Sequence, residues 1–136
     1  MITLAHSLAL HRDPSSWQIP VAEKRIRVNV WWACVIHDYW SSIAHGTPPN
    51  IRQENYDVPL PAEESEAASP SFRHLCSISE VLGDTRPLVY ALRMDVKDAE
   101  KRVRRLECIL DAWEDELPPS LKPPSSGMLT ATPTAR

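Results

Sequence analysis

The chain has 136 residues, 43% of them hydrophobic and 24% charged, with a formal net charge of -3 and a pI near 5.9. This length predicts one domain that buries roughly two-thirds of its unfolded surface. The acidic balance argues against a module that binds nucleic acid by itself, because such modules concentrate positive charge against phosphate. No apolar run approaches the ~20 residues that a membrane-spanning helix needs, and no signal-peptide pattern opens the chain. We therefore expect an intracellular protein without a membrane partner.

Glycine and proline usage predicts an all-α fold. The chain has 3 glycines and 13 prolines, so few positions adopt positive φ at low cost and hairpins are not expected. The prolines fall between periodic segments, where they begin or end helices. We expect a partial helical bundle of about four helices with a long loop, forming a domain of residues 1–117. A disordered Pro/Ser/Thr-rich tail is expected at 118–136.

The first two predicted helices cover residues 2–10 and 20–44. The first ends before Pro14, because the residue that precedes a proline avoids the α region. Pro20 suits the first turn of the second helix, and Gly46 suits its C-cap.

The second helix carries apolar residues every three or four positions, with others that widen the stripe, and such a helix is expected to be surrounded by neighbours. The stripe consists of Ile26, Val30, Ala33, Ile36, Trp40 and Ile43, widened by Val28, Trp31, Cys34 and Val35. Trp31 and Trp32 point about 100° apart on a helix. We expect one of them to pack inward and the other against an adjacent helix; the wall of a ligand pocket is the alternative.

The third and fourth predicted helices cover residues 70–82 and 86–117, separated by Gly83 as a helix stop. The fourth carries an unbroken a/d seam, which predicts either the core face of an antiparallel bundle or a zipper to a partner chain. The seam consists of Leu92, Val96, Ala99, Val103, Leu106, Leu110, Trp113 and Leu117. The expected i,i+4 ion pairs are Asp98 with Arg102 and Glu100 with Arg104. The loop of residues 46–69 ends in an acidic stretch at 63–69.

Three cysteines, Cys34, Cys76 and Cys108, are far apart and odd in number, which predicts buried free thiols. Cys34, His37 and Asp38 stand at i, i+3, i+4, where a helix aligns them. A nucleophile there also needs oxyanion donors, and zinc needs a second ligand pair, neither of which the sequence supplies. We favour a structural role for these residues and keep a small intracellular enzyme as an alternative.

Two basic clusters alternate with acids, which predicts wet helix faces; contact with phosphate or nuclear import is the alternative for each. They are Lys24, Arg25 and Arg27, and Lys101, Arg102, Arg104 and Arg105.

A run of motifs between residues 4 and 61 has a recognisable order. These motifs are Leu8-Ala9-Leu10-His11-Arg12-Asp13, Glu23-Lys24-Arg25-Ile26-Arg27, Trp31-Trp32-Ala33-Cys34, His37-Asp38, Gly46-Thr47-Pro48-Pro49-Asn50-Ile51 and Tyr56-Asp57-Val58-Pro59-Leu60-Pro61. The run resembles the middle homology region of fungal transcription factors whose DNA-binding module is a binuclear zinc cluster. The resemblance implies a piece of a larger nuclear regulator of transcription, with a regulatory domain that neither reads bases nor catalyses a reaction.

The resemblance also implies the partners and the residues of interest. DNA and zinc would belong to a module that this chain lacks, since that cluster needs six closely spaced cysteines; no cofactor is expected in the chain itself. Possible further partners are the transcription machinery, a second copy, or a small-molecule effector. The family signature residues, structural or regulatory, are Arg25, Arg27, Trp31, Trp32, Asp38, Ser41, Gly46, Pro48 and Ile51. The family commonly has arginine where this chain has Tyr39 and Thr47, so the resemblance implies that Asp38 lacks an arginine partner here.

Overall fold

A computed structural model describes residues 1–62, 70–91 and 93–122. Within these ranges the chain forms five α-helices and one 3-10 turn, and no strand. The helices are α1 (Ile2–Ser7), α2 (Val21–His45), α3 (Pro70–Asp84), α4 (Arg86–Val89) and α5 (Val96–Glu116), and the 3-10 turn η1 is Gln53–Asn55. The predicted all-α fold is confirmed.

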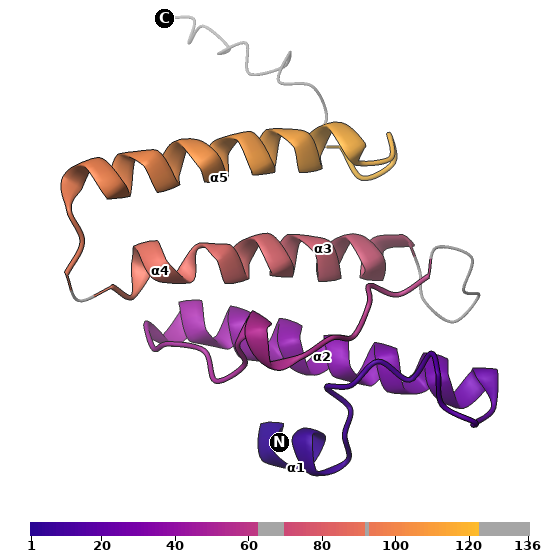
Figure 1. The fold of residues 1–136 in the computed structure, drawn as a ribbon. Coiled ribbons are helices and arrows are strands. Elements are labelled where there is room, and N and C mark those ends of the chain that lie inside the picture. The colour runs from indigo at the N-terminus through magenta and orange to yellow at the C-terminus, as the bar shows by residue number, and fades with distance from the viewer. Residues whose placement is uncertain (63–69, 92, 123–136) are drawn as a thin grey trace, which may run out of the picture.

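The helices stack in layers, as Figure 1 shows. α3, followed by α4, lies between α2 on one side and α5 on the other. α1 contacts the opposite side of α2. The arrangement is a partial bundle in which α2 and α3 form the closest helix pair.

α1 and α2 end in the same way, although only one of them has a glycine at its end. At the end of α2, Gly46 takes φ 65° and donates to the Ile43 carbonyl, while the Thr47 N–H donates to the Ser42 carbonyl. These two bonds define a Schellman motif, as expected for a glycine C-cap. After α1 the left-handed residue is Ala9, at φ 52°, a conformation that costs an alanine roughly 1 kcal/mol.

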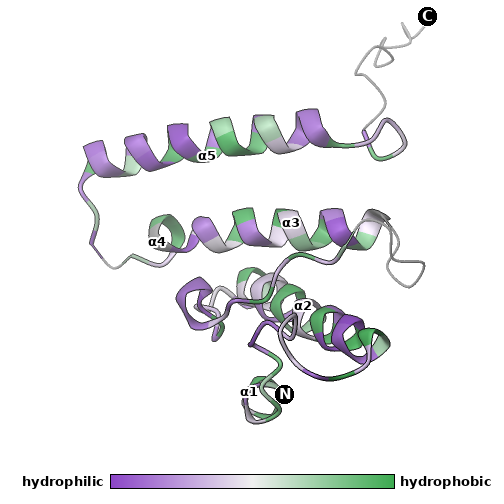
Figure 2. Cartoon of the chain, turned by 45° about the vertical axis from the view of Figure 1, so that its right-hand side comes forward, coloured by the Kyte–Doolittle hydropathy of each residue, from purple (hydrophilic) through white to green (hydrophobic). Residues whose placement is uncertain are grey.

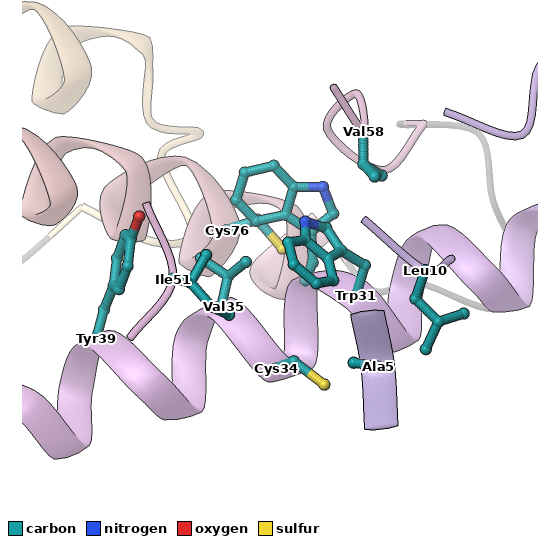
Figure 3. Packing of buried hydrophobic residues seen from close by; sticks show 10 residues of the cluster. Ala5, Leu10, Trp31, Cys34, Val35, Tyr39, Ile51, Val58 and Cys76 are labelled. Atoms are coloured by element: carbon teal, nitrogen blue, oxygen red, sulfur yellow. The ribbon is translucent and has the colours of Figure 1, made fainter. Parts of the chain in front are cut away.

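The core gathers on one side of α2. Trp31, Trp32 and Val35 are fully buried, with Tyr39 further along the same face. Figure 3 shows that residues converge on this face from three places: from α1 and the turn that follows it, from the segment after α2, and from α3. The contributing residues are Ala5, Leu10, Ile51, Val58 and Cys76.

The expectation that neighbours surround α2 is wrong, because most of its predicted apolar stripe is exposed. Ile26, Val30, Trp40 and Ile43 are 42–59% exposed, and Ala33 is exposed as well. Because α2 is apolar on nearly all sides, periodicity alone could not tell the buried face from the outer one. Figure 2 shows green bands along much of this helix, interrupted by purple ones.

The predicted stop at Gly83 is also wrong, since α3 continues to Asp84. Gly83 is buried, and a Cβ built on it would lie 2.8 Å from the Tyr39 ring of α2. This glycine therefore permits a close helix crossing and does not terminate the helix.

The predicted fourth helix is interrupted. Its first turn is α4, and a new helix begins at Val96 because Asp95 caps it, its carboxylate accepting the Lys97 N–H at 3.1 Å. Neither predicted ion pair, Asp98–Arg102 or Glu100–Arg104, forms in this described stretch; the ion pairs that the structure gives lie elsewhere.

Some sequence predictions lie outside the described residues: Leu92, the acidic stretch at 63–69 and most of the tail, 123–136. Leu117, the end of the predicted domain, is buried. A turn follows in which the Leu121 N–H donates to the Pro118 carbonyl. None of the helices in the described ranges is long and apolar enough to cross a membrane.

Candidate functional site

The two neighbouring tryptophans of α2 are both buried and are bridged by a tyrosine. Trp31 packs against His6 of α1, with ring centroids 5.5 Å apart. Trp32 donates from Nε1 to the Pro59 carbonyl at 2.8 Å. The Tyr56 ring contacts both, at 5.4 and 6.0 Å, so it fixes the segment after α2 onto the helix. Both tryptophans therefore pack in the core. Residues of the same chain cover their rings, so the rings do not form the wall of an open ligand pocket.

Asp38 joins the same segment to α2 through hydrogen bonds. Its two carboxylate oxygens accept the Ile51 N–H at 2.7 Å and the Asn50 side-chain amide at 2.9 Å. Asp38 and Ile51 are buried, at 5% and 1% exposure. A buried carboxylate needs such partners, and here an amide and a backbone N–H fill the place that an arginine would take.

A third attachment lies at the end of α2. The Ser42 hydroxyl donates to the Thr47 carbonyl and lies 2.8 Å from the Tyr90 hydroxyl, just after α4. Arg86 of α4 donates to the Gly83 carbonyl and lies 3.8 Å from Glu54. The turn after α2 is thus held from both sides, by α2 and by α4.

An open groove of about 460 Å³ lies between this turn and α4. Arg52 and Arg86 bring positive charge to it, and Tyr90 brings a hydroxyl. Its lining residues are Pro48, Pro49, Arg52, Glu54, Asn55, Arg86, Tyr90 and Ala91. Of the predicted signature only Pro48 lines this groove.

Arg27, another signature residue, ties the segment before α2 to the helix. Its guanidinium lies 4.8 Å from the centre of the Trp17 ring, donates to the Leu8 carbonyl and pairs with Glu23 at 3.8 Å. Arg25 is exposed. The carbonyl of Ser41 accepts from the His45 ring at 2.7 Å.

The Cys34, His37 and Asp38 constellation does not converge on one site. Cys34 and Asp38 are buried while His37 is exposed, and both carboxylate oxygens of Asp38 are already occupied. Burial raises the pKa of the Cys34 thiol, which disfavours the nucleophilic thiolate. Across the described residues, no three His, Cys, Asp or Glu side chains gather as metal ligands.

Most of the signature residues therefore lie in two places, one around the tryptophans and one around the turn after α2, whereas Arg25 is exposed and Ser41 contacts only His45 of its own helix. Trp31 and Arg27 hold the N-terminal part, Trp32 holds the segment at Pro59, and Asp38, Gly46 and Ile51 shape the turn. Several residues that hold this region carry no signal for that role in the sequence, namely Asn50, Tyr56, Gly83, Arg86 and Tyr90. Of these, only Asn50 and Tyr56 belong to the motifs between residues 4 and 61, and the sequence of those motifs does not indicate what either residue contacts.

This arrangement defines a helical domain whose buried polar and aromatic residues fix its own fold. A profile of the family described as the fungal specific transcription factor domain matches residues 1–112. The chain belongs to this family of fungal transcription regulators.

Individual relatives agree with the family assignment. The chain is 35% identical to the cutinase transcription factor 1 beta of Fusarium vanettenii over 48% of its own length and 7% of that protein's. It is 32% identical to an uncharacterized transcriptional regulatory protein of Schizosaccharomyces pombe over 66% of this chain and 15% of the other. The acetamidase regulatory protein of Aspergillus oryzae is 25% identical over 92% of this chain and 17% of its own.

The chain thus spans less than a fifth of the length of each of these relatives. No solved structure shows significant similarity to it.

Proposed function

We propose that this chain acts in the nucleus as a regulatory domain of a transcription regulator, and that it does not read bases itself. The family match over residues 1–112 carries the proposal. The charge supports it, because the chain as a whole is acidic and α5 itself carries seven acidic residues against five basic ones. A base-reading module would concentrate positive charge on one face.

We propose further that zinc belongs to the DNA-binding module of the family and that this domain binds no metal and catalyses no reaction. The three thiols support this proposal, since Cys34, Cys76 and Cys108 stand on three different helices. A binuclear cluster needs six closely spaced cysteines, so these residues do not fit that group.

A reporter assay tests the regulatory role. The chain is fused to a heterologous DNA-binding domain and recruited to a promoter, and output is compared with that of the DNA-binding domain alone. We expect a change in output with the wild-type chain, and its loss with Asp38→Ala, which removes the attachment of the turn after α2. Glu116→Ala, an exposed change, should behave as wild type. Equal output with and without the chain at equal promoter occupancy would contradict the proposal.

The groove beside α4 is the place that we propose for a small-molecule effector. The lining carries two arginines and one acid, Glu54, which lies 3.8 Å from Arg86, so Arg52 leaves a net positive charge there, which suits a small carboxylate. A thermal-shift screen of small carboxylic acids would detect binding, and Arg52→Ala should abolish the shift; a shift that survives Arg52→Ala would place the ligand elsewhere.

A further inference from the structure

Half of the apolar seam of α5 is exposed in the part of the chain that the structure describes. The two rows of this seam are Ala99, Leu106 and Trp113, which are half-buried, and Val96, Val103 and Leu110, which are 69%, 40% and 42% exposed. The first row faces α3, where the Trp113 Nε1 donates to the Ser77 hydroxyl at 2.8 Å. The second, which we call the outer row, repeats every seven residues and has no partner among the described residues.

Charge is segregated along the same helix. Residues 96–105 contain five bases and two acids, a net charge of +3, whereas residues 106–116 contain five acids and no base, a net charge of -5. The last turn has no basic residue, although a helix C-terminus is stabilised by positive charge. An isolated α5 is therefore destabilised at its C-terminal end, and an antiparallel partner helix would relieve this.

We propose that the outer row is the contact surface for a second copy of this chain, with the two α5 helices antiparallel about a two-fold axis between Val103 and Leu110. In this register Val103 faces the partner's Leu110, and Leu110 faces the partner's Val103. Such an interface is self-complementary, as a two-fold dimer requires. The proposal goes beyond the regulatory role and does not depend on it.

The charges that flank the outer row select the antiparallel orientation. All six flanking side chains are exposed. They are Lys97, Glu100 and Arg104, with a net charge of +1, and Glu107, Asp111 and Glu114, with a net charge of -3. Antiparallel helices bring these two groups together, whereas parallel helices would bring like beside like.

The exposed face of α2 does not offer this complementarity. Its charged residues near Ile26 are mostly basic, and the acid Asp38 is buried on the other side. A 21-residue helix is about 31 Å long, and one pair of such helices forms a contact at the small end of specific interfaces, below about 1,200 Å². We therefore expect a weak dimer that high salt disfavours.

Sedimentation velocity of the full 136-residue chain tests the dimer. The sedimentation coefficient should rise between about 1 and about 100 µM and fall again at high salt. Val103→Glu with Leu110→Glu should give a monomer with an unchanged helical circular dichroism spectrum. Cys108→Glu with Ala112→Glu adds the same charge to the exposed opposite side of α5 and should dimerise as wild type. A wild-type monomer at about 100 µM, or a dimer that survives the first pair of changes, would overturn the proposal.

Two further sets of variants test the charges and the register. Arg104→Glu should lower the dimer fraction, and adding Asp111→Arg should restore it. If the variant with Val103→Glu and Leu110→Glu fails to fold, this charge reversal still tests whether the dimer forms through α5. In a Cys108→Ser background, Val103→Cys together with Leu110→Cys should form disulfide-linked dimers. Val103→Cys alone should not, because the two copies of position 103 would lie about 10 Å apart along the axis of an antiparallel pair. Cross-linking by the single variant would indicate parallel helices and overturn the register.

Discussion

Asp38 shows at the scale of one residue how this domain uses its polar side chains. Its carboxylate holds the Ile51 N–H and the Asn50 amide, so one buried acid determines where the chain goes after α2. Tyr56 and Ser42 make the neighbouring attachments. These residues position the turn that borders the groove.

Substituting Asp38 by alanine should lower the free energy of unfolding by about 2–3 kcal/mol, because it leaves the buried Ile51 N–H without a partner. Urea denaturation followed by circular dichroism measures the change. Glu116→Ala is the control and should stay within about 0.5 kcal/mol of wild type. A loss for Asp38→Ala as small as that of the control would show that the hydrogen bonds contribute little.

The left-handed residues after α1 and α2 allow a reciprocal test. Ala9→Gly should raise the free energy of unfolding by about 0.5–1 kcal/mol, and Gly46→Ala should lower it by about 1 kcal/mol. Both values come from the same denaturation experiment. Destabilisation by Ala9→Gly would mean that the backbone there does not adopt the left-handed conformation.

The pKa of Glu80 predicts a dependence of stability on pH. Burial raises the pKa of its carboxyl above the ordinary value, and the nearby Asp84 raises it further, against a lowering by Arg73. The folded state therefore binds this proton more tightly than the unfolded state, so stability is lost as pH rises through the folded pKa. Glu80→Gln should match wild type at low pH and be more stable than wild type at pH 7. A difference that is constant with pH would contradict this assignment.

At the scale of elements, the contact between α2 and α3 depends on a missing Cβ. Gly83→Ala should cost about 1–3 kcal/mol, because the new methyl group meets the Tyr39 ring. In a Tyr39→Leu background the same change should cost much less, giving a coupling energy of at least about 0.5 kcal/mol in a double-mutant cycle. Additive effects would place the ring elsewhere.

The bounds of α2 could be predicted to within one residue, because Pro20 and Gly46 are strong local signals at its ends. Which face of α2 is buried could not be predicted, since residues such as Val30 and Val35 are equally apolar and only the position of neighbouring helices separates them. Gly83 predicts a helix stop because the sequence does not show that the Tyr39 ring packs over it.

The prediction of one continuous helix over residues 86–117 is wrong for a related reason. The regular spacing of apolar residues concealed the capping signal of Asp95, which begins α5 well after the first turn at Arg86. The candidate site was predictable only in part. Trp31, Trp32 and Asp38 were identified, whereas Asn50 and Arg86 matter through contacts that the long loop creates after folding.

The whole molecule has an inner and an outer half. Among the described residues, α2 contributes seven buried side chains and is held by α1, α3 and the segment after it, whereas α5 contributes none and packs against α3 and α4. Local stability follows burial and contacts, so the two halves should open at different free energies. The fold is therefore organised around α2, and the Asp38 attachment is part of that centre.

Native-state hydrogen exchange measures this most directly, on the Val103→Glu and Leu110→Glu variant so that self-association does not protect α5. We predict the slowest exchange in α2 between Trp31 and Ser42 and at the Ile51 amide, with α5 exchanging faster. Protection of α5 equal to that of α2, or an Ile51 amide that exchanges as fast as an exposed loop, would contradict the account.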